Sequence, residues 1–180
     1  MTKTPFAKFA SIAMIAALSL PLTANMANAQ SSPKQIKQNK AWGAYSHTGA
    51  SGKFCFVLSI PIEKLPETKN GSKVDHGDNF FTVSQRPGQQ LRLESQFKAG
   101  YSLQENSKVA VDIDGNKFSM FTRSNSAWLE DPNREGALVA AMKAGSKMKI
   151  AAVSRRGTQT SYTYSLSGIT ASLNEIQNCN

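Results

Sequence analysis

The residues best suited to chemistry in this chain are its two histidines, His47 and His76, and His76 lies within the short acidic run Asp75-His76-Gly77-Asp78. Imidazole and carboxylate groups can bind zinc, and carboxylates can bind calcium. A zinc site needs roughly three or four ligands of defined geometry, and a calcium loop spreads its oxygen ligands over about twelve residues. This run meets neither requirement. We therefore expect a solvated polar turn, with no bound metal and no cofactor.

The sequence contains no recognisable arrangement of residues for nucleophilic catalysis. Serines are plentiful, but no G-x-S-x-G motif occurs, and a cysteine held in a disulfide cannot act as a thiolate nucleophile. Paired carboxylates for glycoside hydrolysis cannot be picked out because their spacing is spatial rather than sequential. We expect no enzyme activity, and an unrecognised hydrolase is the remaining alternative.

A group of basic residues near the C-terminus forms a candidate patch for an anionic partner. Two of its lysines alternate with apolar residues, which is typical of a strand with a solvent-facing side. Cations also stabilise helix C-termini and protect sheet edges from aggregation, so a structural role competes with binding. The members of the patch are Lys143, Lys147, Lys149, Arg155 and Arg156.

The first 29 residues have the pattern of a cleaved secretory signal peptide. Lys3 and Lys8 precede an apolar run over 9–20, and Ala27-Asn28-Ala29 provides the small-x-small cleavage pattern. The apolar run is shorter than the roughly 20 residues of a spanning helix. The sequence therefore predicts a mature chain that starts at Gln30, is periplasmic and does not span the membrane, with outer-membrane association and secretion as alternatives.

The remaining residues, 30–180, make one ordinary domain with a basic surface. Cleavage would remove two of the 21 basic residues and none of the 12 acidic ones, which leaves a net charge of +7. A positive surface attracts lipopolysaccharide, phospholipid headgroups or acidic glycans, although it also simply maintains solubility. Export argues against nucleic acid as the partner.

Two cysteines remain in the mature chain, Cys55 and Cys179. An even pair in an oxidising compartment predicts a disulfide, and two free thiols are the alternative. The closed loop would contain more than a hundred residues. For a loop of that length the chain-entropy model allows about 4 to 5 kcal/mol of stabilisation.

Most of the mature chain has the period-two apolar pattern of strands. Residues 30–41 are polar and read as a flexible leader, and residues 65–79 read as a long exposed loop, our preferred partner-contact region. Tyr162 and Tyr164 share one strand face, whose hydroxyls we expect to reach water at its rim. The predicted strands cover 54–60, 80–86, 91–97, 109–113, 118–121, 148–152 and 162–166.

Helical signals interrupt this pattern twice. Asp131 is a good N-cap and Gly145 a good C-terminal stop for a helix over about 132–144. The capping-box spacing of Ser172 and Glu175 predicts a short C-terminal helix. The chain is therefore all-β and mainly antiparallel, a β-sandwich or barrel-like sheet over 42–180 with one inserted α-helix and a short C-terminal helix.

Three strings give this chain a family resemblance: FTVSQRPG, GYSLQENSKVAVDIDGNKFSMFT and SAWLEDPNREGALVAAMKAGSKMKIAAVSRRGTQTSYTYSLSGITASL. In these strings the chain resembles the invasion-associated locus B family of alphaproteobacterial exported proteins, from about Trp42 to Cys179. The resemblance implies a periplasmic or surface-exposed β-rich domain with a link to entry into host cells, chiefly erythrocytes. It implies no catalytic mechanism.

We therefore expect an exported envelope or surface binding protein that assists host-cell association or invasion. Its partner would be a host-cell surface or an anionic envelope component. The alternative is a periplasmic protein of envelope maintenance that binds anionic cell-wall or lipid components.

Overall fold

The computed structural model describes residues 32–49, 52–85 and 93–177. The predicted signal peptide lies outside the described residues. The elements are β1 (Lys34–Asn39), β2 (Trp42–Gly49), β3 (Gly52–Ser59), β4 (Glu63–Leu65), β5 (Thr68–Lys69), β6 (Ser72–Lys73), β7 (Phe80–Gln85), β8 (Leu93–Lys98), β9 (Lys108–Ile113), β10 (Asn116–Arg123), β11 (Ser126–Leu129), a 3-10 turn (Pro132–Arg134), α1 (Glu135–Ala144), β12 (Lys147–Val153), β13 (Gln159–Ser165) and α2 (Ile169–Ile176).

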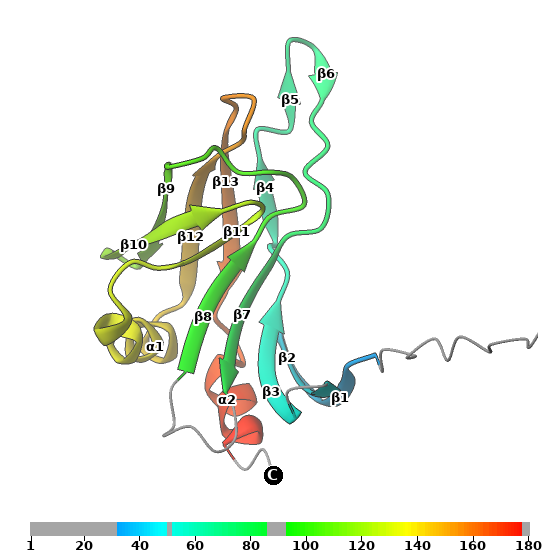
Figure 1. Ribbon diagram of the computed structural model, residues 1–180, viewed down its shortest axis with the longest axis vertical. Helices are drawn as coiled ribbons and strands as arrows, with labels where there is room; N and C mark the ends of the chain where they lie inside the picture. The colour runs from blue at the N-terminus through cyan, green and yellow to red at the C-terminus, as the bar shows by residue number, and fades with distance from the viewer. Residues whose placement is uncertain (1–31, 50–51, 86–92, 178–180) are drawn as a thin grey trace, which may run out of the picture.

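Within the described residues, one large antiparallel sheet has the strand order β1-β2-β3-β7-β8-β11-β10-β9-β12-β13-β4. The short strands β5 and β6 form a separate hairpin that projects from one end of the molecule (Figure 1). The two edge strands of the large sheet, β1 and β4, do not pair with each other in the described part of the chain. The predicted all-β antiparallel class is thus confirmed in its sandwich-like form, and the sheet does not close into a barrel.

The core lies where the two halves of this sheet face each other. Phe97 on β8 packs against Tyr162 on β13 with ring centroids 5.6 Å apart, and Phe81 on β7 packs against Tyr164 at 6.2 Å. The ring of Trp42 meets Phe81 edge-on, and all five side chains are fully buried. Large aromatic side chains therefore hold the two layers together.

Both predicted helices are present. The Asp131 side chain accepts a hydrogen bond from the backbone N–H of Asn133, and a 3-10 turn over 132–134 leads into α1. The helix α2 is confirmed, but its predicted capping position is wrong, because Gly168 occupies the N-cap. Ser172 instead lies inside α2, where its buried hydroxyl donates to the carbonyl of Trp42. No helix in the described ranges is both long and apolar enough to cross a membrane.

The predicted flexible leader is wrong for residues 34–39, which form β1. This strand pairs with β2, and its end is fixed to α2 through a hydrogen bond from Asn39 Nδ2 to Ser172 Oγ of 3.1 Å. An ion pair of 2.9 Å joins Lys37 to Glu175. The polar composition reflects an edge strand whose side chains face water while its backbone pairs with the sheet.

We expect Gly168→Ala to destabilise the fold strongly. Gly168 has a φ of +97°, and an added Cβ would overlap the carbonyl oxygen of Asn39. A positive φ costs a non-glycine residue about 1 to 2 kcal/mol before any overlap is counted. Gly136→Ala in α1 is the matched control, since open space surrounds it, and should be neutral or stabilise by up to about 1 kcal/mol. Urea unfolding of both variants measures the difference, and equal stabilities would show that β1 does not pack on α2.

Cys55 is buried on β3, and Cys179 lies outside the described residues, so their pairing stays a prediction. Gln85 is the cross-strand neighbour of Cys55, and its Nε2 donates to the carbonyl of Gln177 at 3.4 Å. This contact brings the chain, two residues before Cys179, close to Cys55. We expect non-reducing peptide mass spectrometry of the mature protein to find the two cysteines linked, and reduction to lower the melting temperature. Free thiols at both positions would contradict the pairing.

Candidate binding cleft

A cleft of about 270 Å³ opens at the end of the molecule that carries the β5–β6 hairpin. Its walls come from three segments: residues 74–76 after β6, residues 101–102 between β8 and β9, and residues 154–156, 158 and 160 around the β12–β13 turn. Figure 1 shows this turn and the hairpin at the end opposite α2. We call this the distal cleft.

Backbone hydrogen bonds hold the wall formed by the β12–β13 turn. The N–H of Arg155 donates to the carbonyl of Ser102 at 2.8 Å, and the N–H of Thr158 donates to Ser154 Oγ at 3.1 Å. Gly157 completes the turn with a φ of +76°, a conformation that favours glycine. The backbone positions of Arg155 and its neighbours are therefore set by the fold.

A chain of side-chain hydrogen bonds runs from the core to the cleft wall. Nε2 of His76 lies 3.0 Å from the carbonyl of Pro66, and its Nδ1 lies 2.9 Å from the hydroxyl of Tyr162. That hydroxyl lies 2.9 Å from the hydroxyl of Tyr101, which lies 2.6 Å from Thr160 Oγ1. We call this the His76 chain; Tyr101 and Thr160 at its outer end line the cleft.

The carbonyl at one end of this chain fixes a proton on His76, and burial fixes the proton of Tyr162. A carbonyl oxygen only accepts, so the Nε2 of His76 carries a proton and donates to Pro66. Burial raises the pKa of Tyr162 well above that of an ordinary tyrosine, and the hydrogen bond to Tyr101 raises it further. Tyr162 therefore keeps its proton, and its hydroxyl donates to the hydroxyl of Tyr101.

The charged groups around the cleft are mixed in sign. The side chains of Arg155 and Arg156 are exposed at its mouth, and Lys69 donates to Thr158 Oγ1 at 2.9 Å. Asp75 contributes a carboxylate to the same wall, where its Oδ1 accepts from the N–H of Gly77 at 2.8 Å. The lining of the cleft thus includes two arginines and one aspartate.

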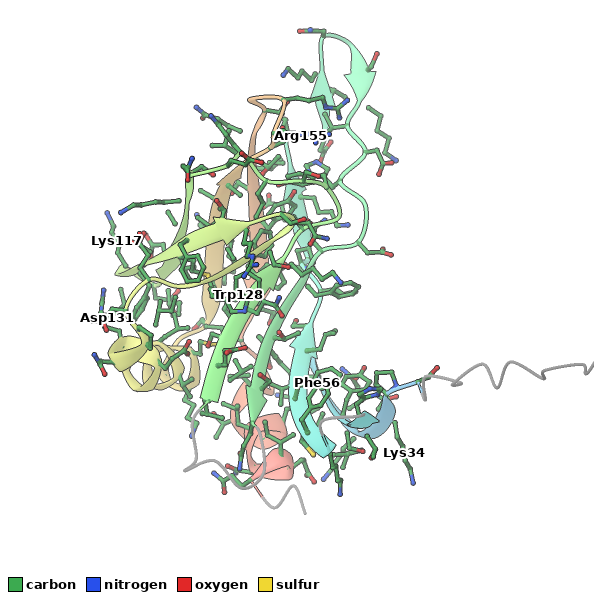
Figure 2. The ribbon with its side chains drawn as sticks, in the orientation of Figure 1. Lys34, Phe56, Lys117, Trp128, Asp131 and Arg155 are labelled. Atoms are coloured by element: carbon green, nitrogen blue, oxygen red, sulfur yellow. The ribbon has the colours of Figure 1, made fainter. Side chains whose placement is uncertain are left out.

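The predicted five-residue basic patch is not one cluster. Lys147 and Lys149 lie exposed at the start and along the outer face of β12, where Asp112 on β9 is the cross-strand neighbour of Lys149. Arg155 and Arg156 lie beyond the other end of that strand, roughly 20 Å away by strand rise. Lys143 lies in the last turn of α1 and borders a separate shallow hollow near α2. Only the two arginines border the distal cleft, and Figure 2 shows Arg155 near that end.

The acidic run around His76 is not simply a solvated turn. Asp75 and Asp78 are exposed, but His76 is buried and hydrogen-bonded at both ring nitrogens. No group of three histidine, cysteine or acidic residues in the described part of the chain is placed to hold a metal. His47 lies far away on β2, edge-on to the ring of Phe54 at 5.2 Å.

The tyrosines of β13 differ from their sequence prediction. Tyr162 and Tyr164 are fully buried, so their hydroxyls do not reach water at a rim. Sequence reasoning also missed Tyr101 and Thr160 as members of the cleft. Tyr162 is 86 residues from His76 and 61 from Tyr101, so no local spacing could have indicated the His76 chain.

Comparison with known proteins finds a matching family model and a solved structure of similar fold. A family model described as "Invasion associated locus B (IalB) protein" matches residues 52–177. The crystal structure of invasion associated protein b from Bartonella henselae superimposes with a TM-score of 0.53 and 16% sequence identity, covering 81% of this chain and 96% of that one. This likeness shows a shared fold. No curated protein sequence matches this chain.

We expect Tyr162→Phe and Tyr164→Phe to change the free energy of unfolding differently, although both tyrosines are fully buried on one strand face. Loss of the Tyr162 hydroxyl removes a partner from both His76 and Tyr101, which should cost about 1 to 3 kcal/mol. The Tyr164 hydroxyl is buried without a hydrogen-bond partner among the described residues. Its removal should be neutral or stabilising. Chemical denaturation measures both, and equal losses would contradict the role of the His76 chain.

Proposed function

Because this chain belongs to the invasion associated locus B (IalB) family, we propose that it is an exported envelope protein that binds an anionic glycan without chemical turnover. Through this binding it assists association with host cells. The signal-peptide pattern of residues 1–29 and the invasion-associated family name support export and the host role. The glycan chemistry is common to two sources, sulfated or carboxylated host-surface glycans and bacterial lipopolysaccharide.

The observation that carries this proposal is the pair Arg155 and Arg156 at the mouth of the distal cleft. Guanidinium groups bind carboxylate and sulfate oxygens through two parallel hydrogen bonds, which gives specificity as well as attraction. The backbone of this turn is already fixed by Ser102 and Ser154. Little backbone ordering therefore opposes binding.

The cations of the distal end reinforce this attraction over a wider surface. Lys69 and Lys73 are exposed on the β5–β6 hairpin, and Lys69 donates to Thr158 of the cleft wall. Glu67 and Asp75 are the acidic groups nearest to them along the chain. The cleft and hairpin can therefore meet a polyanion with several weak ionic contacts, each screened by salt.

Binding is favoured over hydrolysis by the hydrogen bonds of His76. A histidine that acts as a general base needs one nitrogen that faces an accessible nucleophile or an attacking water, and the hydroxyl partner of His76 is on the fully buried Tyr162. Both ring nitrogens of His76 are engaged, one by Pro66 and one by Tyr162. The histidine at this cleft therefore serves to position side chains.

We expect the mature protein to bind heparin and lipopolysaccharide with an affinity that falls steeply as salt rises. Arg155→Ala combined with Arg156→Ala should weaken binding by about tenfold, because two guanidinium contacts are lost. Surface plasmon resonance at several sodium chloride concentrations measures both effects.

The matched control is Lys147→Ala with Lys149→Ala, which removes the same charge from the other end of β12. It should change binding by no more than about twofold, through long-range charge alone. Equal losses in the two double variants would mean that net charge, rather than the distal cleft, determines binding. Protease treatment of intact bacteria then separates the sources, since only a surface-exposed protein meets host glycans.

A further inference from the structure

We propose that the distal cleft is a subsite for a single acidic sugar unit, with its carboxylate on Arg155 and Arg156 and a ring hydroxyl on Tyr101. This inference rests on the proposed function and specifies the chemistry of its ligand. The cleft differs from a general basic surface because it is hollowed, and its polar groups come from three separate chain segments.

The size of the cleft suits one sugar ring. Its volume of about 270 Å³ lies just below the usual lower limit of small-molecule sites, which is about 300 Å³. A single pyranose with one charged substituent can enter such a space. The rest of a glycan chain would lie outside, across the exposed hairpin of β5 and β6.

The hydroxyl groups on the walls match a sugar better than a bare anion. Tyr101 and four serine or threonine residues line the cleft, although the Thr160 hydroxyl is already bonded to the carbonyl of Ala152 and to Tyr101. A sulfate or phosphate ion can use these hydroxyls only as donors, whereas a sugar hydroxyl can use them as donors or as acceptors. The four side chains are Ser102, Ser154, Thr158 and Thr160.

Asp75 sharpens this distinction. Its carboxylate lines the same cleft as the two arginines. It repels a small anion that carries negative charge on every side, but it can accept a hydrogen bond from a sugar hydroxyl. Two cations and one acceptor carboxylate in the same lining therefore suit a ligand with a single anionic group and several hydroxyls.

Tyr101 retains hydrogen-bonding capacity for the ligand. Thr160 donates its only hydroxyl proton to the carbonyl of Ala152, so the Tyr101 hydroxyl donates to Thr160 and accepts from Tyr162. His76 fixes Tyr162 from behind, with Nδ1 2.9 Å from its hydroxyl. Tyr101 can therefore offer a ligand only an acceptor, for example to a sugar hydroxyl, and Tyr162 and His76 act as positioning residues.

The test is a heteronuclear NMR titration of the mature protein, residues 30–180, with glucuronate, glucose and sodium sulfate as separate probes. We expect glucuronate to shift amide signals of Ser102, Arg155 and Thr158. Glucose and sulfate should bind at least about tenfold more weakly, because glucose lacks the carboxylate and sulfate lacks the ring hydroxyls. Sulfate that binds as well as glucuronate at the same residues would overturn the acidic-sugar assignment.

Two variants locate the contacts. The double variant Arg155→Ala with Arg156→Ala should abolish the glucuronate shifts, and Tyr101→Phe should weaken glucuronate by about three- to tenfold. Tyr45→Phe is the matched control for Tyr101→Phe, since Tyr45 stacks on Phe56 at 5.3 Å on another part of the sheet. Glucuronate binding unchanged in both cleft variants would overturn the subsite. Melting temperatures verify that each variant is folded.

The titration and the heparin experiment fail in distinguishable ways. Heparin binding that depends on Arg155 and Arg156, without glucuronate shifts in the cleft, would overturn the subsite and leave the proposed function standing. Loss of both would overturn the proposed function as well.

Discussion

The burial of the Tyr162 hydroxyl is the constraint on which the candidate site depends. Its ring packs on Phe97 to join the two layers of the sheet, so the aromatic core requires it. A buried hydroxyl without a partner costs about 1 to 3 kcal/mol. His76 and Tyr101 supply the partners, and to do so residues 66–79 and the β8–β9 connection must come together over β13. Two of the three walls of the distal cleft therefore also supply the hydrogen-bond partners of one core residue.

At the opposite end of the molecule the main constraint is the open edge of the sheet at β1. The edge strand β1 exposes polar side chains, including Lys34 and Lys37, which discourage pairing with another chain. Its backbone is held on the inner side by β2, and Asn39 is fixed to α2 through Ser172. The close approach of Asn39 to Gly168 leaves no room for a side chain at the start of α2. Glycine is therefore required at this position by packing as well as by its backbone angle.

Local sequence patterns predicted much of the fold and little of the site. The Asp131 cap and the alternation in β9, β12 and β13 are local signals, and the structure contains those elements. The strand β1 was missed because an edge strand exposed to water has no apolar alternation to detect. His76 was misread as a solvated residue because its partner Tyr162 lies 86 residues away. Such a hydrogen bond depends on how two layers pack, and that information is absent from short windows of sequence.

The basic residues also show that closeness in the sequence does not reveal which charges lie together in space. Five cations within 143–156 looked like one patch, yet a strand separates their ends by roughly 20 Å, about twice the distance over which salt screens surface charge. Lys149 also faces Asp112 across the sheet, which offsets its charge locally. Arg155 and Arg156 instead extend from a turn whose backbone is fixed and which borders a hollow lined with hydroxyls. Net charge explains why an anion would approach this protein, whereas the placement of guanidinium groups and hydroxyls in one cleft determines which anion it can retain.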